Sequence, residues 1–80
     1  MHPEQIKQLI LAGMACTHLS LDGDGQHFEA VVVSDEFAGL NRVQRQQRVY
    51  QTLKAKLATG ELHAISFKTL TPEEWSVQRG

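Results

Sequence analysis

The chain has 80 residues, one cysteine and a formal net charge of −1. A domain this small buries only about 60 to 65% of the surface that its unfolded chain would expose, which excludes a deep enclosed active site, and a charge near zero excludes a global attraction to nucleic acid or anionic lipid. The lone Cys16 excludes an internal disulfide and a four-thiolate metal site, so we expect one domain over residues 1–80 in a reducing, cytoplasmic setting.

The first predicted element is an amphipathic helix that follows Pro3 and ends at Gly13. Its apolar residues recur at helical spacing, at Ile6, Leu9, Ile10 and Met14. The same stretch contains an acidic residue and no long apolar core. We therefore expect neither a signal peptide nor a membrane span.

Two strands joined by a tight loop are predicted next. Apolar residues alternate with polar ones from Thr17 to Leu21, and the run from Phe28 to Val33 is rich in β-branched residues. Between them lies Asp22-Gly23-Asp24-Gly25, which is typical of a turn. The two strands should pair antiparallel.

A long helix is predicted from Leu40 to Ala58 and should close at Thr59-Gly60. Its apolar residues are expected on one side, at Val43, Val49, Tyr50, Leu53 and Leu57. A strand from Ala64 to Thr69 follows, in which Ile65 and Phe67 share one face. Cys16 is interpreted as a small packing residue.

The last helix has a strongly specified start. Thr71 can act as the N-cap, Pro72 stands at the first helical position, and Glu74 can complete a capping box with Thr71. The element order is then α-β-β-α-β-α. Because the third strand must return beside the hairpin after a long helix, we expect an α+β fold with a three-stranded mixed sheet and helices mainly on one face.

Three motifs in this chain resemble those of the BolA family. V-S-x-x-F-x-G runs from Val33 to Gly39, R-x-x-R-V-Y from Arg45 to Tyr50, and H-A followed by K-T-x-T-P-x-x-W from His63 to Trp75. The motifs occur in the right order and spacing over nearly the whole chain. The sequence most resembles the short bacterial branch of the family, the IbaG or YrbA type. The resemblance implies a class II KH-like fold.

The resemblance also implies a role for His63 of the H-A motif. In the family this histidine is a ligand of a [2Fe-2S] cluster that is shared with a monothiol glutaredoxin and glutathione. Judged by its position alone, His63 would be an edge-strand histidine bonded to water or backbone. One or two imidazoles leave at least two of four ligand positions to thiolates from elsewhere, so a partner is required and no cluster is expected on the chain alone.

The sequence departs from the family pattern at two places. The loop before the second strand usually carries a Cys or His as second ligand, and residues 22–26 carry neither. His27 is the nearest substitute; its alternative interpretation, like that of His18, is a solvated strand residue. Many members also have R-H-R in the central helix, where this chain has Arg45-Gln46-Gln47-Arg48.

A basic stripe along the long helix supports a second hypothesis, a transcriptional regulator that binds DNA or RNA. The stripe comprises Arg42, Arg45, Arg48 and Lys56. It could equally be a solvated helix face, or a contact for an acidic or glutathione-bearing partner. The G-x-x-G clamp of KH domains is missing, since residues 39–42 contain no second glycine, so binding should be weak and sensitive to salt.

Motifs for catalysis are missing from the sequence. There is no G-x-S-x-G, no phosphate loop and no pair of carboxylates with a pocket to occupy, and the glutamates after Pro72 are explained by the helix start. We therefore predict a protein that is not an enzyme and that is a monomer on its own.

Overall fold

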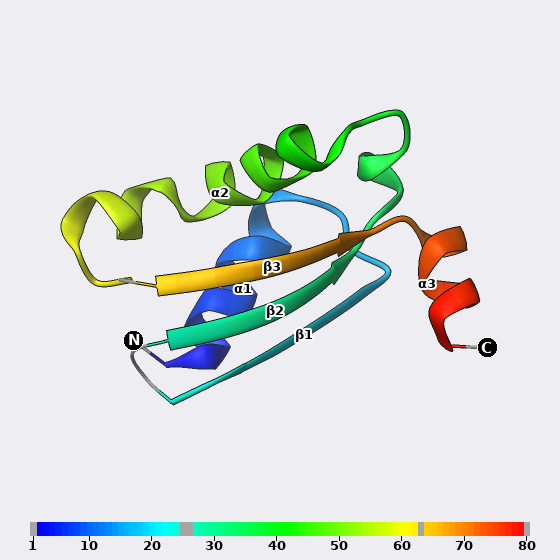
Figure 1. The fold of residues 1–80 in the computed structure, drawn as a ribbon. Helices are drawn as coiled ribbons and strands as arrows, with labels where there is room; N and C mark the ends of the chain where they lie inside the picture. The colour runs from blue at the N-terminus through cyan, green and yellow to red at the C-terminus, as the bar shows by residue number, and fades with distance from the viewer. Residues whose placement is uncertain (1, 25–26, 63, 80) are drawn as a thin grey trace.

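The computed structural model describes residues 2–24, 27–62 and 64–79, and within them it contains three α-helices and one three-stranded sheet (Figure 1). The elements are α1 (Pro3–Gly13), β1 (His18–Gly23), β2 (His27–Val33), a 3-10 helix (Asp35–Phe37), α2 (Arg42–Thr59), β3 (Ala64–Leu70) and α3 (Pro72–Arg79). The predicted α+β class and the α-β-β-α-β-α order are confirmed. The short 3-10 helix was not predicted.

The sheet is mixed, as predicted. β2 is the central strand, β1 pairs with it antiparallel and β3 pairs with it parallel. Its inner face is covered by α1 and α2, whereas α3 stands at the end of the sheet where β3 finishes (Figure 1). The buried core lies on this inner face and includes Leu19, Phe28, Ala30, Val32, Ile65 and Phe67.

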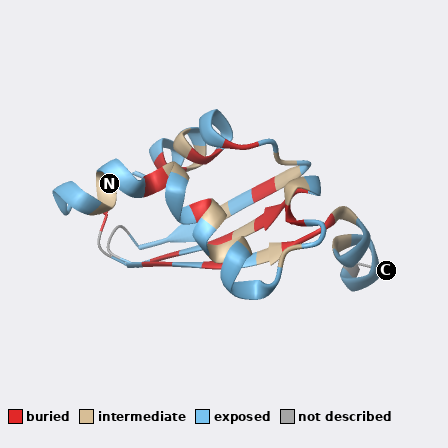
Figure 2. Ribbon diagram, turned by 90° about the horizontal axis from the view of Figure 1, so that it is seen from above, coloured by how far each residue is buried: buried red, intermediate tan, exposed pale blue. Residues whose placement is uncertain are grey.

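The register defines two opposite ends of the sheet. At one end His18, Val33 and Leu70 lie side by side, next to α3. At the other end, beside the β1–β2 loop, His27 pairs with Ala64. Buried residues follow the strands and the helix faces turned toward them, whereas no described residue of α3 is buried (Figure 2).

α2 differs from the prediction at its start, and its apolar side is buried unevenly. It begins at Arg42 because Asn41 is the N-cap, and Gln44 completes a capping box with Asn41. The apolar residues share one side of α2, as predicted, but Val43 and Tyr50 on that side are 64% and 39% exposed. At 100° per residue both lie about 100 to 120° around the helix from the buried Val49, at the margin of the apolar stripe.

The ends of the helices follow from local chemistry. Gly60 has a φ of 80° and ends α2, as predicted. Gly13 ends α1 and also permits a close helix crossing, because a Cβ there would lie 2.7 Å from Thr52 Cγ2. None of the described helices is long and apolar enough to cross a membrane.

The predicted start of α3 is confirmed. The Thr71 N–H donates to Glu74 Oε1 at 2.8 Å, and the Glu74 N–H donates to Thr71 Oγ1 at 3.2 Å. These reciprocal bonds form the capping box that the T-P-x-x-W motif suggested. They fix the angle between β3 and α3.

Candidate functional site

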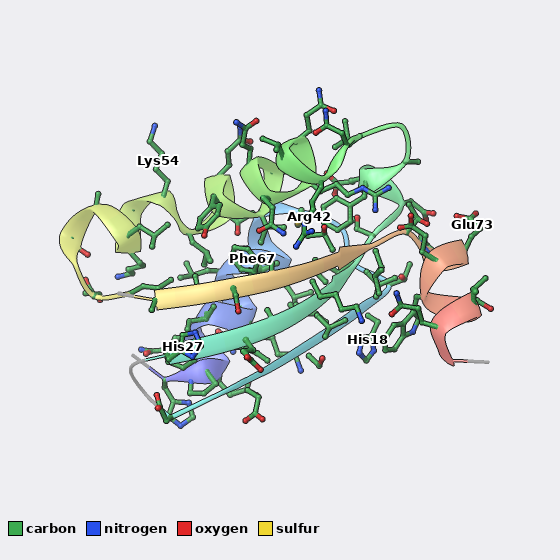
Figure 3. The ribbon with its side chains drawn as sticks, viewed as in Figure 1. His18, His27, Arg42, Lys54, Phe67 and Glu73 are labelled. Carbon is green, nitrogen blue, oxygen red and sulfur yellow. The ribbon has the colours of Figure 1, made fainter. Side chains whose placement is uncertain are left out.

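His27 lies at the hairpin end of the sheet, by which we mean Asp22 to Asp24, His27, Glu29 and Ala64 (Figure 3). The His27 backbone N–H donates to Asp24 Oδ1 at 2.8 Å, and its carbonyl accepts from the Asp24 N–H at 3.2 Å. The His27 side chain is exposed and has no hydrogen bond or ring contact within the described residues. Its imidazole is therefore open to a partner.

Three acidic residues, Asp22, Asp24 and Glu29, line the same shallow hollow as His27. A [2Fe-2S] cluster held by thiolates is itself negative, so this hollow opposes its approach electrostatically. Within residues 2–24, 27–62 and 64–79, no group of three or more His, Cys, Asp or Glu side chains could hold a metal ion. The other predicted ligand, His63, lies outside the described residues.

The other two described histidines contact the fold itself. His2 is the N-cap of α1, and its Nδ1 accepts the Glu4 N–H at 3.3 Å, which the sequence analysis missed. His18, predicted to be a solvated strand residue, instead stacks on Trp75 of α3, with ring centroids 4.6 Å apart and an interplanar angle of 21°. The stack joins β1 to α3.

At the end of the sheet opposite the hairpin end, a hydrogen-bond network around Glu36 links the 3-10 helix to α2 and to the segment between α1 and β1. Glu36 Oε2 accepts the Ala15 N–H at 2.5 Å, and Glu36 Oε1 accepts from Arg48 Nη2 at 2.7 Å and Nε at 3.1 Å. Arg48 also donates to the Gly13 carbonyl at 3.0 Å. The buried Ser34 hydroxyl donates to the Ala15 carbonyl and accepts the Glu36 N–H. The Ala15 N–H, and then Arg48, hold the pKa of Glu36 below its usual range.

Arg45 connects α2 to the start of α3. It donates to the carbonyls of Leu40 at 3.0 Å and Thr69 at 3.4 Å and pairs with Glu74 at 2.7 Å. The Arg45 side chain is only 16% exposed. Its bond to Glu74, together with the Thr71 N–H, holds the pKa of Glu74 below its usual range. We call these Glu36 and Arg45 networks the anchored end of the sheet.

Comparison with known proteins identifies the family. The family model described as "BolA-like protein" matches residues 11–74. This chain belongs to the BolA family. It is 34% identical to the acid stress protein IbaG of Escherichia coli K12 over 79 residues, which cover 99% of this chain and 94% of that one.

Two further similarities extend the BolA assignment. The DNA-binding transcriptional regulator BolA of Haemophilus influenzae is 43% identical over 61 residues, which cover 76% of this chain and 58% of that protein. The solved structure of a BolA homologue from Coxiella burnetii has a TM-score of 0.85 and 38% identity, and covers 95% of this chain and 97% of that one. The BolA fold suggested by the motifs is thereby confirmed.

The BolA motifs of this chain are largely explained by folding. Arg45 and Arg48 of R-x-x-R-V-Y bind glutamates in the other two motifs, Glu74 and Glu36. Lys56 of the predicted basic stripe lies 3.3 Å from a carboxylate oxygen of Glu61. Among the four predicted cations, Arg42 alone has no ion pair within the part of the chain that the structure describes.

Cys16 lies just before β1 and packs against the core, as predicted. Burial, and then the nearby Glu36 carboxylate, raises the pKa of its thiol. A raised pKa keeps the thiol protonated, which disfavours both nucleophilic attack and metal binding. Cys16 is a structural residue.

Proposed function

We propose that this BolA protein is a regulator that shares a [2Fe-2S] cluster with a monothiol glutaredoxin and contributes His63 as a ligand. Its relatives are named as an acid stress protein and a transcriptional regulator, which supports a regulatory and non-catalytic role. The observation that carries the proposal is the register at the hairpin end. There the exposed His27 pairs with Ala64, the residue that follows His63 in the sequence.

The ligand chemistry defines what the partner must bring. This chain offers imidazoles, so thiolates of the glutaredoxin and of glutathione would complete the four-ligand set. An imidazole ligand can be protonated, which would make the bound cluster both redox-tuned and labile. Because the acidic residues in the same hollow as His27 oppose a negative cluster, we assign the main role to His63 and keep His27 as the second candidate. Reduced thiols also require a reducing compartment, which supports a cytoplasmic location.

The proposal is tested by mixing the protein with a monothiol glutaredoxin that carries a reconstituted cluster and glutathione. The wild-type protein should change the visible absorption and circular dichroism of the cluster, and His63→Ala should abolish the change. His18→Ala is the matched control, because it removes an imidazole from the anchored end, next to α3. An unchanged spectrum with wild-type protein, or an equal loss with His18→Ala, would contradict the proposal.

A second candidate function is binding of DNA or RNA as a transcriptional regulator. The similarity to the protein named as a DNA-binding regulator favours it. Removing Arg45 or Arg48 would break ion pairs within the fold, so substitution of the whole predicted stripe cannot separate binding from folding. The first test is therefore whether the wild-type protein binds any nucleic acid at low salt, and absence of binding would reject this function.

A further inference from the structure

A groove separates the start of α2 from β3. It is lined by Asn41, Arg42, Arg45 and Gln46 on the helix side and by residues 67–69 on the strand side, with Glu74 nearby. The Arg42 side chain lies between α2 and β3 in Figure 3. The groove lies away from the hairpin end and is thus separate from the proposed cluster ligands.

The groove has a net positive charge. Arg45 and Glu74 both line it, but they form an ion pair and offset each other. Arg42 and Lys68 are exposed and have no hydrogen bond or ion pair within the described ranges. Arg42 on the helix side therefore remains available for an anion. Lys68 adds a second cation at the strand margin of the groove, where its side chain alternates with that of Phe67 toward the outer face of the sheet.

Backbone donors at the start of α2 reinforce this charge. Asn41 satisfies the N–H groups of Gln44, through its side chain, and of Arg45, through its carbonyl. The N–H groups of Arg42 and Val43 come earlier in the first turn, where the helix itself provides no carbonyl acceptor for them. The positive end of the dipole of this 18-residue helix thus coincides with the Arg42 wall of the groove.

An exposed aromatic ring continues the same surface along α2. Tyr50 is 39% exposed, and its hydroxyl lies 3.5 Å from the Ile65 carbonyl. Its ring packs edge-on against Phe67, with centroids 5.0 Å apart and an interplanar angle of 77°. Tyr50 follows Arg42 by eight residues, about 12 Å along the helix, which is a span of a few nucleotides. The ring is held in place while part of its surface stays open.

The free edge of β3 completes the surface. Side chains of α2 bind its outward carbonyls: Gln46 Nε2 donates to Phe67 at 3.0 Å and Arg45 donates to Thr69 at 3.4 Å. The N–H groups of Phe67 and Thr69 point to the same side as these carbonyls. The covered carbonyls disfavour addition of a further strand, whereas N–H donors remain for a phosphate or a base.

We call the groove, Tyr50 and the free edge of β3 together the seam between α2 and β3. We propose that this seam binds single-stranded nucleic acid, with Arg42 and Lys68 on the phosphates and Tyr50 stacked on a base. Cations that follow the backbone, together with an aromatic ring for stacking, are the means by which single strands are bound. The inference rests on the second candidate function. It assigns the contact with nucleic acid to this seam instead of to the predicted basic stripe along α2.

The charge contacts are tested by fluorescence anisotropy with labelled short single-stranded DNA and RNA over a range of salt. Arg42→Ala/Lys68→Ala should weaken binding about tenfold or more at low salt and reduce the slope of log K against log salt by about 1.4, since each phosphate contact to a single strand contributes about 0.7. The matched control is Lys7→Ala/Lys54→Ala. It removes the same charge outside the groove, and Lys54 points away from β3 in Figure 3.

The stacking contact is tested with two substitutions of Tyr50. Tyr50→Ala should weaken binding about 5- to 150-fold, whereas Tyr50→Phe, which keeps the ring, should bind like wild type. Thermal melting by circular dichroism verifies that both variants fold. Provided that the wild-type protein binds nucleic acid, three results would each overturn the inference. They are equal affinity of Tyr50→Ala and Tyr50→Phe, an equal loss of affinity in the Lys7→Ala/Lys54→Ala control, and tighter binding of the matching duplex than of the single strand. If wild type binds no nucleic acid, the second candidate function fails and the seam assignment fails with it.

Discussion

The two ends of the sheet differ in how far their polar side chains form hydrogen bonds or ion pairs within the chain. At the anchored end, Ser34, Glu36 and Arg48 are all bonded to other parts of the chain. At the hairpin end, the imidazole of His27 has no bond to any described residue. The BolA motif residues at the anchored end are thus explained by stability. The histidine at the hairpin end has no such explanation and is available for function.

The largest effect should come from the core beneath the anchored end. Phe37 is fully buried, so Phe37→Ala should lower the free energy of unfolding by about 3 to 5 kcal/mol. Urea denaturation followed by circular dichroism measures the change. Val77→Ala is the control, because Val77 is 80% exposed and its truncation should cost less than about 0.5 kcal/mol. Similar midpoints for the two variants would show that the anchored end does not support the fold.

Acid should weaken the anchored end through its two glutamates. The pKa values of Glu36 and Glu74 are lowered in the folded state, so both groups stabilise the fold above their unfolded pKa. This stability is lost as the pH falls below about 5 and through the folded pKa values.

The pH dependence is measured as the urea midpoint between neutral and acid pH. Glu36→Gln/Glu74→Gln should be less stable at neutral pH and should lose less stability below pH 5, because it lacks both titrating groups. The control Asp35→Asn/Glu73→Gln removes exposed carboxylates from the same two helices. If the first double variant shows the same pH curve as wild type, the ion pairs do not stabilise the folded protein.

The stack between β1 and α3 should have a smaller effect. His18→Ala removes one ring of the pair and should cost about 0.5 to 1.5 kcal/mol. Trp75 is the single tryptophan of the chain, so its fluorescence reports on this contact directly. His27→Ala, which is remote from the stack, should leave the fluorescence unchanged. The same fluorescence in His18→Ala as in wild type would mean that the two rings are not in contact in solution.

The sequence was sufficient wherever structure depends on neighbouring residues. Alternation within β3 predicted the buried Ile65 and Phe67, and the Thr71 cap predicted the start of α3. The ion pair between Arg45 and Glu74 was not predictable, because the two residues are 29 positions apart and meet only once α2 has packed beside the start of α3.

The candidate site was predicted less well than the fold. The prediction of a basic stripe assumed that this side of α2 is open to solvent. Two of the stripe's arginines, Arg45 and Arg48, are instead part-buried in ion pairs. Tyr50 was placed on the apolar side of the long helix, but its 39% exposure was not predictable, because periodicity identifies an apolar side and not its buried width. His63, the main predicted ligand, was selected by the family motif and stays a prediction.

The smallest stability effect should come from His27, and it sharpens the contrast between the two ends. His27→Ala should change the free energy of unfolding by less than about 0.5 kcal/mol, because the imidazole is exposed and unbonded within the described residues. The same variant, mixed with the cluster-loaded glutaredoxin, separates two roles. A loss of the dichroism change without a loss of stability would assign His27 as the second ligand despite its carboxylate neighbours. A stability loss above about 1 kcal/mol would instead make His27 a residue of the fold, and the difference between the two ends would then disappear.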